Sequence, residues 1–125
     1  MTEDDLLRTV LEMARLFGLM TAHFRPAQVR DKDGAQRWVT AVQGDGKGFL
    51  DLTIVGPGGV MFRELKSEKG QLSPDQRKWI SKLTEGDADA GVWRPADLRS
   101  GRIERELRAL RKPAPQPASL TATTI

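Results

Sequence analysis

The sequence contains no cysteine, which excludes disulfide bonds and metal sites built from thiolates. It has one histidine, His23, so a bound metal ion would depend mainly on carboxylate, carbonyl and water oxygens. Oxygen-rich sites of this kind favour Mg²⁺ or Mn²⁺ over Zn²⁺.

The sequence also lacks any apolar run close to the ~18 residues that a membrane span requires. Its first residues, MTEDDLL, are acidic, whereas the start of a secretory signal peptide is basic. We therefore expect a cytoplasmic protein. The length of 125 residues fits one domain. We expect residues 1–111 to form it and the proline- and threonine-rich residues 112–125 to be a disordered tail.

The formal net charge is only +3, a weak bias toward polyanionic partners. Basic residues are concentrated in the C-terminal third, where arginine and lysine outnumber acids between residues 94 and 112. Such a segment is as typical of a solvated helix face with ion pairs as of a nucleic-acid-binding surface. Charge alone therefore does not decide between the two.

Hydrophobic periodicity and turn residues predict helices near both ends of the domain and strands between them. Leu6, Val10 and Ala14 recur on one helical face, and Ser73-Pro74 combines a helix cap with proline at the first helical position. The predicted helices are 2–18, 73–84 and 95–111, and the predicted strands are 21–30, 37–42, 49–55, 60–66 and 88–93. The order α-β-β-β-β-α-β-α predicts an α/β fold in which helices flank a mixed β-sheet.

The hairpin whose turn lies at residues 56–59 carries the most informative side chains. If this turn is symmetric, the residues that flank it face each other, and stepping back along both strands places Asp51 opposite Glu64. Lys66 shares their face because side chains alternate along a strand. A shift of one residue would move Asp51 to the other face, so the prediction depends on this turn.

Two carboxylates and an amine on one patch suit phosphodiester hydrolysis. Asp51 and Glu64 can hold a divalent cation together, and the backbone carbonyl of Leu65 can supply a further oxygen ligand. The cation polarises a phosphate oxygen and lowers the pKa of bound water. Lys66 can orient that water, help to deprotonate it, or stabilise developing charge.

The alternative is an ordinary cross-strand ion pair on the surface, which has the same spacing and contributes little to stability. Two features favour the functional interpretation. Asp51 interrupts an apolar strand, where an unpartnered charge is costly to bury. The hairpin also lies between predicted helices that are able to cover it.

The segments Gly48-Phe-Leu-Asp51-Leu, Glu64-Leu-Lys66 and Leu72-Ser-Pro-Asp-Gln76, followed by Trp79, resemble the VRR-NUC family. This family belongs to the PD-(D/E)xK nuclease superfamily, and the similarity extends from Leu7 to Leu107. The resemblance implies a restriction-endonuclease-like fold, metal binding by Asp51 and Glu64, and a catalytic role for Lys66. This chain has Phe-Leu-Asp where the superfamily often has Pro-Asp, which puts only the local turn in doubt.

The same resemblance implies two further site residues. Gln76 matches the family's glutamine on the helix after the E-x-K strand and would face the site. Glu12 matches its acidic residue on the first helix and would be an additional metal contact. A solvated position on a helix is the alternative for both residues.

Several other residues are candidate nucleic-acid contacts, which would position a backbone without reading its sequence. They are His23, Arg25, Lys47, Lys69, Arg77 and Lys78. The alternative is a satisfied structural role for the histidine and ordinary surface solubility for the others. The three tryptophans are expected in the core or at an interface.

Together these patterns predict a metal-dependent endonuclease that hydrolyses DNA with Mg²⁺ or Mn²⁺. No module for reading sequence is evident, so we expect selection by structure, as at flaps, branches or junctions. The resemblance implies phage or bacterial DNA replication or repair, and the small size suggests a homo-oligomer or a partner. The alternatives are a nucleic-acid-binding module that keeps the fold without catalysis and a structural protein with a charged hairpin.

Overall fold

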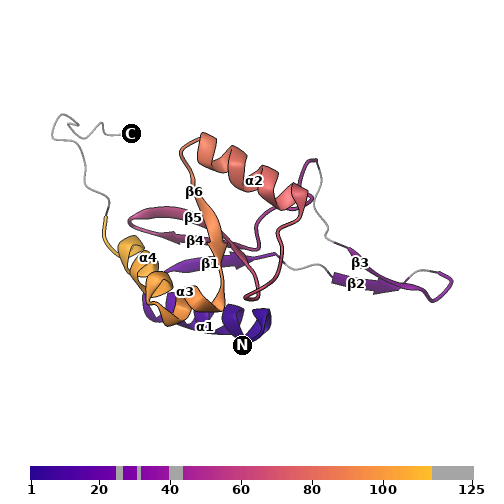
Figure 1. Ribbon diagram of the computed structural model, residues 1–125, viewed down its shortest axis with the longest axis horizontal. Helices are drawn as coiled ribbons and strands as arrows, with labels where there is room; N and C mark the ends of the chain where they lie inside the picture. Colours follow the sequence, from indigo (N-terminus) through magenta and orange to yellow (C-terminus); the bar gives the residue numbers. More distant parts are fainter. Residues whose placement is uncertain (25–26, 31, 40–43, 114–125) are drawn as a thin grey trace.

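The computed structural model describes residues 1–24, 27–30, 32–39 and 44–113. The predicted contact residue Arg25 lies outside these ranges, as do residues 114–125 of the predicted tail. The elements in chain order are α1 (Glu3–Leu16), β1 (Met20–His23), β2 (Ala27–Arg30), β3 (Gln36–Val39), β4 (Leu52–Gly56), β5 (Gly59–Leu65), α2 (Pro74–Glu85), β6 (Asp89–Trp93), α3 (Pro95–Arg99) and α4 (Arg102–Leu110) (Figure 1). No helix in the described part of the chain combines the length and apolar composition needed to cross a bilayer.

A mixed four-stranded sheet organises the molecule, as the sequence predicted. Its strand order is β1-β4-β5-β6. Strand β4 pairs antiparallel with both β1 and β5, whereas β6 pairs in parallel with β5. This antiparallel hairpin followed by a helical crossover into a parallel strand is consistent with a restriction-endonuclease-like fold.

The core lies on the face of the sheet that α1 and α4 cover. The buried apolar side chains of these helices pack on those of β4, β5 and β6, and the central ones are Leu6, Val10, Leu52, Ile54, Met61, Trp93, Ile103 and Leu107. Helix α2 packs near β6 and has no fully buried residue. The two sides of the sheet therefore differ, with a packed core on one and a half-open helix layer on the other.

Helices α1 and α2 both begin with a capping box, and the one at Ser73 is the cap that the sequence predicted. The Thr2 side chain accepts a hydrogen bond from the Asp5 N–H, and the Asp5 carboxylate accepts one from the Thr2 N–H, at 2.9 Å. Ser73 and Gln76 form the same reciprocal arrangement at the start of α2. Each capping box satisfies backbone donors that the first helical turn would otherwise leave unpaired.

Three element boundaries differ from the prediction. The single extended segment at 21–30 divides into β1, in the main sheet, and β2, which pairs only with β3. Pro26 lies between them and has no N–H for a ladder. The predicted helix 95–111 divides at Gly101, whose φ of 84° suits glycine. Strand β4 begins at Leu52 rather than at Phe49.

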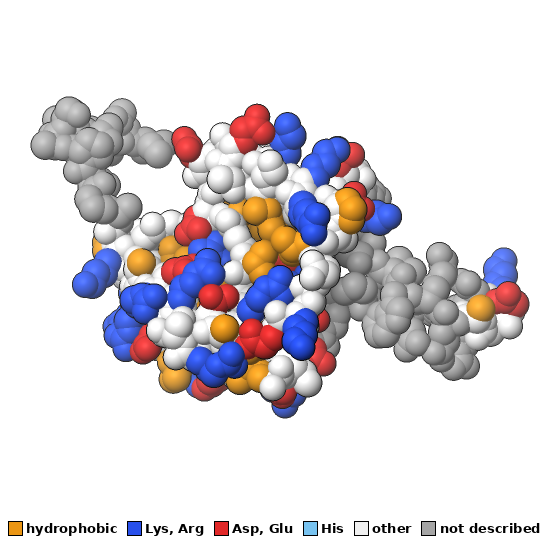
Figure 2. All heavy atoms as spheres, viewed as in Figure 1, with side chains coloured by type: hydrophobic (Ala, Val, Ile, Leu, Met, Phe, Trp, Pro, Cys, Tyr) orange, Lys and Arg blue, Asp and Glu red, His pale blue; other side chains and the backbone are white. Residues whose placement is uncertain are grey.

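Three arginines of the basic C-terminal third, Arg99, Arg102 and Arg108, form ion pairs with acids. Arg99 lies 2.5 Å from Glu68, and Arg108 lies 2.9 Å from Glu104. Figure 2 shows basic and acidic side chains interspersed over the face that carries α3 and α4. Of the two interpretations of this segment, the ion-paired helix surface is therefore the one that the structure favours.

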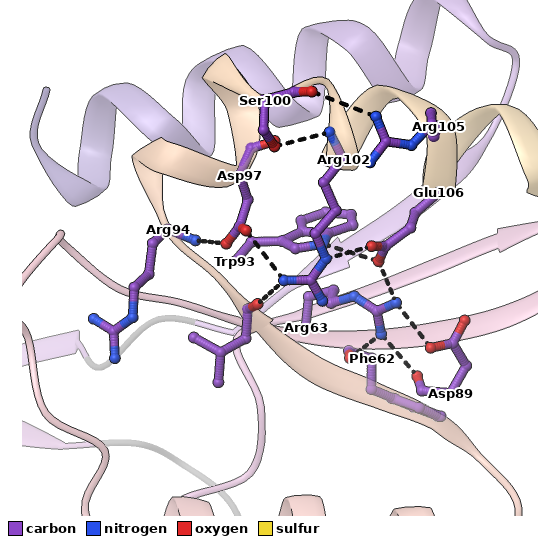
Figure 3. A network of polar contacts seen from close by, with 11 residues as sticks. Phe62, Arg63, Asp89, Trp93, Arg94, Asp97, Ser100, Arg102, Arg105 and Glu106 are labelled. Carbon is purple, nitrogen blue, oxygen red and sulfur yellow. Dashed lines mark hydrogen bonds and ion pairs between the residues drawn. The ribbon is translucent and has the colours of Figure 1, made fainter.

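A network of polar contacts links β5 to α4 within this face (Figure 3). Arg63 is 3% exposed, and its guanidinium donates to Asp89 at 2.8 Å and to Glu106 at 2.7 Å. Glu106 also accepts hydrogen bonds from Trp93 and Arg102. Burial acts to raise the pKa of Glu106, but hydrogen bonds from Arg63, Arg102 and Trp93 hold it below its ordinary value.

We expect Glu106→Gln to lower the free energy of unfolding by about 2 kcal/mol at neutral pH, because the buried Arg63 loses a charged partner. A carboxylate with a lowered folded pKa contributes stability above its unfolded pKa and loses it as the pH falls. The difference from wild type should therefore shrink below pH 4.5. Urea unfolding at several pH values measures this. Glu104→Gln, which breaks the exposed pair with Arg108, should cost less than about 0.5 kcal/mol.

Candidate active site

The hairpin register agrees with the one derived from the turn. Val55 pairs with Val60, and the ladder continues to the pair of Leu52 with Arg63. Asp51 lies one residue beyond the ladder, directly before β4, rather than within a strand. Its backbone N–H donates to Glu64 Oε2 at 3.1 Å. The two acidic residues that the sequence placed opposite each other are therefore in contact.

A second hydrogen bond runs the other way between the two segments. The Leu65 N–H donates to Asp51 Oδ2 at 3.1 Å. Each carboxylate is thus held by a backbone donor from the opposite segment. Because the N–H and C=O of one strand residue point to the same side, the Leu65 carbonyl is also directed toward Asp51.

Glu64 is almost completely buried, at 2% exposure. Its Oε1 accepts a hydrogen bond from Gln76 Nε2 at 2.8 Å and lies 3.9 Å from Lys66 Nζ. Gln76 is itself fixed, because its Oε1 accepts from the Ser73 N–H at 2.9 Å. The capping box of α2 therefore aims the glutamine at the carboxylate, so the predicted glutamine does face the site.

Burial and the nearby charge of Asp51 raise the pKa of Glu64 to about 8. Hydrogen bonding to the Asp51 N–H and the charge of Lys66 act in the opposite direction but do not compensate. Without a counterion, this carboxyl group therefore holds a proton at neutral pH. A divalent cation would supply the missing positive charge and displace that proton.

A small cavity opens beside these groups. It has a volume of about 140 Å³ and is lined by Glu3, Asp4, Leu7, His23, Phe24, Asp51 and Leu65. The predicted contact residue His23 thus lies beside the predicted metal-binding acid. The Phe24 N–H donates to the Asp51 carbonyl at 2.8 Å, which fixes the backbone of this acid from the β1 side.

The donors in and next to this cavity fit a hard divalent cation. Asp51 lines it and offers carboxylate oxygens, and Leu65, which also lines it, offers a carbonyl oxygen. Glu64 is not part of the lining but adds a carboxylate in contact with Asp51. Within the described ranges, no group of three or more His, Asp or Glu side chains stands ready to bind a metal. Magnesium tolerates such a sparse set, because it is usually held by one or two carboxylates and keeps several water ligands.

The structure does not bring Glu12 to this cavity. Its carboxylate pairs with Arg15 at 2.6 Å, and it lines a separate hollow with Arg8 and Thr21. The acids that α1 presents beside Asp51 are Glu3 and Asp4. About 12 Å of helix separates Asp4 from Glu12. Periodicity identifies the buried face of a helix but not which end of it lies at the site.

The remaining predicted contact residues occupy two kinds of position. Lys47 and Lys78 line a hollow beside α2. Lys69, in the loop after β5, and Arg77, on α2, are exposed and line neither cavity. Only the first two therefore share a concave surface.

Sequence reasoning missed Arg94, which organises the loop that follows Lys66. Its Nη1 donates to the carbonyls of Ser67 at 2.6 Å and Gly70 at 2.7 Å. The Lys66 N–H donates to the Trp93 carbonyl at 3.0 Å, so β6 also fixes the start of this loop. No local pattern could have indicated Arg94, because its partners are 24 and 27 residues away in sequence.

Comparison with known families places the central part of the chain. A family model described as the VRR-NUC domain matches residues 20–97. This range includes Asp51, Glu64, Lys66 and Gln76 but not α1. Comparison with curated proteins and with solved structures gave no match.

We expect Glu64→Gln to stabilise the metal-free protein at alkaline pH. A carboxyl group whose folded pKa is about 8, against 4.5 ordinarily, costs stability as the pH rises between these values. The uncharged variant escapes this loss, so it should exceed wild type by roughly 2–4 kcal/mol at pH 9 and match it below pH 4.5. Urea unfolding in EDTA measures the difference. The exposed Glu85→Gln serves as the control and should unfold with the same free energy as wild type. A difference in unfolding free energy between Glu64→Gln and wild type that does not change with pH would contradict the expectation.

Proposed function

Because the VRR-NUC domain matches residues 20–97 of 125, the chain belongs to this family of the PD-(D/E)xK nuclease superfamily, and on that premise we propose that it is a divalent-metal-dependent endonuclease acting on DNA. Family membership implies nuclease activity. The observation that supports this site is the reciprocal bonding of Asp51 and the Glu64-Leu65 segment, with 3.1 Å in both directions. It brings together two acids that are thirteen residues apart in sequence.

Three groups of this chain would hold the ion: the carboxylates of Asp51 and Glu64 and the carbonyl of Leu65. Bound there, Mg²⁺ or Mn²⁺ would polarise the scissile phosphate and acidify a water molecule. Gln76 keeps Glu64 oriented through its 2.8 Å hydrogen bond. These groups are held before substrate arrives, which is the condition for electrostatic stabilisation without reorganisation.

Lys66 acts beside the ion-binding acids. Its side chain is 16% exposed, and its Nζ lies 3.9 Å from Glu64 Oε1. An ammonium group in this partly buried position stabilises negative charge that develops on the phosphate and orients the attacking water by hydrogen bonding. Arg94 supports this role indirectly, because it fixes the loop that follows the lysine.

The substrate we propose is DNA chosen by structure, at flaps, branches or junctions. The sheet and helices that the structure describes carry no separate module for reading bases, and so small a domain covers little DNA. A role in phage or bacterial DNA replication or repair, a cytoplasmic location and a homo-oligomeric state stay predictions from the sequence.

We expect Asp51→Asn and Lys66→Met each to lower the cleavage rate at least about 100-fold, because the first weakens a ligand of the cation and the second removes the ammonium charge beside the scissile phosphate. Asparagine retains an oxygen that can accept from the Leu65 N–H, so the fold should persist. The assay uses a panel of flap, junction, nicked and linear DNAs with Mg²⁺ or Mn²⁺, and EDTA should abolish cutting.

A binding readout separates metal loss from misfolding. Mn²⁺ should raise the Tm of the wild-type chain through preferential binding to the folded state but should leave the Tm of Asp51→Asn unchanged. Glu104→Gln, on the exposed face of α4, serves as the matched control and should cut normally. Full activity of Asp51→Asn, or DNA binding with no cutting of any substrate in either metal, would overturn the proposal.

A further inference from the structure

A second hollow lies beside the candidate active site, between the loop at 44–48 and helix α2. Its volume is about 440 Å³, and it is lined by Gly44, Asp45, Lys47, Asp75, Lys78, Trp79 and Lys82. The size matches that of cavities that take small molecules. It is separate from the smaller cavity that contains Asp51 and Leu65.

The loop wall of this hollow is fixed in place. Trp79 Nε1 donates to the Asp45 carbonyl at 3.0 Å, and the Phe49 N–H closes a turn onto the Gly46 carbonyl at 3.0 Å. Gly48 has a φ of 81°, and a Cβ at this position would lie 2.5 Å from the Cβ of Asp75. The loop therefore packs against α2 too closely for any other residue at position 48, and the hollow is formed before a ligand arrives.

Both walls lead directly into the candidate active site. The loop wall continues from Lys47 into Asp51, and Phe49 between them packs edge-on against Trp79, with 5.0 Å between ring centroids. On the helix wall, Asp75 precedes Gln76, which donates to Glu64 at 2.8 Å. One turn of helix, about 5.4 Å, separates Asp75 from Trp79. A ligand in the hollow would thus lie next to a phosphate held at Asp51 and Glu64.

The lining combines positive charge with an aromatic ring. Lys47, Lys78 and Lys82 exceed the acids Asp45 and Asp75 by one charge. Lys47 pairs with Asp75 at 3.7 Å, and Lys82 pairs with Glu85 outside the lining at 3.5 Å. The two lysine side chains are 90% and 66% exposed, and such exposed pairs are weak enough for a phosphate to replace. Trp79 is half-buried and offers an apolar surface among the ammonium groups.

We propose that this hollow binds an unpaired nucleotide of the strand that enters the active site, with its phosphate on the lysines and its base against Trp79. That this nucleotide belongs to a substrate strand rests on the proposed nuclease function. Basic grooves with aromatic side chains are the usual way in which proteins hold single strands. A base within a duplex is stacked and paired, so it cannot enter a hollow of this kind without leaving the helix. The hollow therefore selects substrates with a single-stranded segment next to the cut.

The test measures binding of the full chain in EDTA, so that cleavage plays no part. The probes are a labelled oligothymidylate and a blunt duplex of equal length. Lys78→Ala/Lys82→Ala should weaken binding of the single strand about tenfold and that of the duplex less than threefold, and should reduce the salt dependence for the single strand. Arg105→Ala/Lys112→Ala removes the same charge from exposed positions on α4 and just after it and should change neither affinity more than threefold.

Tryptophan fluorescence tests the stacking contact separately. Oligothymidylate should quench the emission of the wild-type chain. Trp79→Phe should reduce this quenching, because the ring that contacts the base is gone and only the background emission of Trp38 and Trp93 remains. The inference is overturned if the single strand does not bind or if quenching is undiminished in Trp79→Phe. It is also overturned if Lys78→Ala/Lys82→Ala weakens the binding of both probes equally or of neither. If the chain shows the expected binding but cuts no DNA, the nucleotide-binding role of the hollow stands and the nuclease proposal is overturned. If the chain cuts DNA normally but Lys78→Ala/Lys82→Ala binds both probes like wild type, the nuclease proposal stands and the role of the hollow is overturned.

Discussion

The burial of Glu64 beside Asp51 is the constraint on which the rest of the site depends. Two like charges in a poorly solvated place are unfavourable unless donors or a cation compensate. The chain provides donors from three directions: the Asp51 N–H, Gln76 and Lys66. These donors orient Glu64 but leave its pKa at about 8. The side chains of the site are therefore already in position, but their negative charge is not fully balanced. Binding of a divalent cation is most favourable under this condition.

Strand β5 connects this site to the two unequal sides of the sheet. Arg63 and Glu64 are adjacent and both are buried, and because side chains alternate they point to opposite faces. Arg63 bonds to Glu106 on α4, within the well-packed core layer. Glu64 bonds to Gln76 on α2, the layer without a fully buried residue. One strand thus joins Glu64, proposed to bind the metal ion, to the packed core layer on one side and to the more open α2 layer on the other.

Local rules predicted the parts of the site that depend on short-range chemistry. The glycine- and proline-rich turn determined the register, so the contact between Asp51 and Glu64 could be derived by counting residues. The cap at Ser73 likewise predicted where α2 begins, whereas the orientation of Gln76 toward the site was implied only by the resemblance to the VRR-NUC family. Long-range packing determined the remainder. Which end of α1 meets the cavity, and which carbonyls Arg94 holds, depend on how elements dock, and no pattern within one segment records this.

The position of Asp51 shows why the loop before it matters to the chemistry. This residue lies outside the β4 ladder, yet its carbonyl accepts from the Phe24 N–H and its own N–H donates to Glu64. Its backbone is therefore fixed from β1 and β5 together, while the preceding loop is clamped at Gly48 against Asp75. A slip of one residue in that loop would break both backbone bonds and turn the carboxylate away from Leu65. The close packing that forms the second hollow is thus the same packing that holds Asp51, the proposed metal-binding acid, in register.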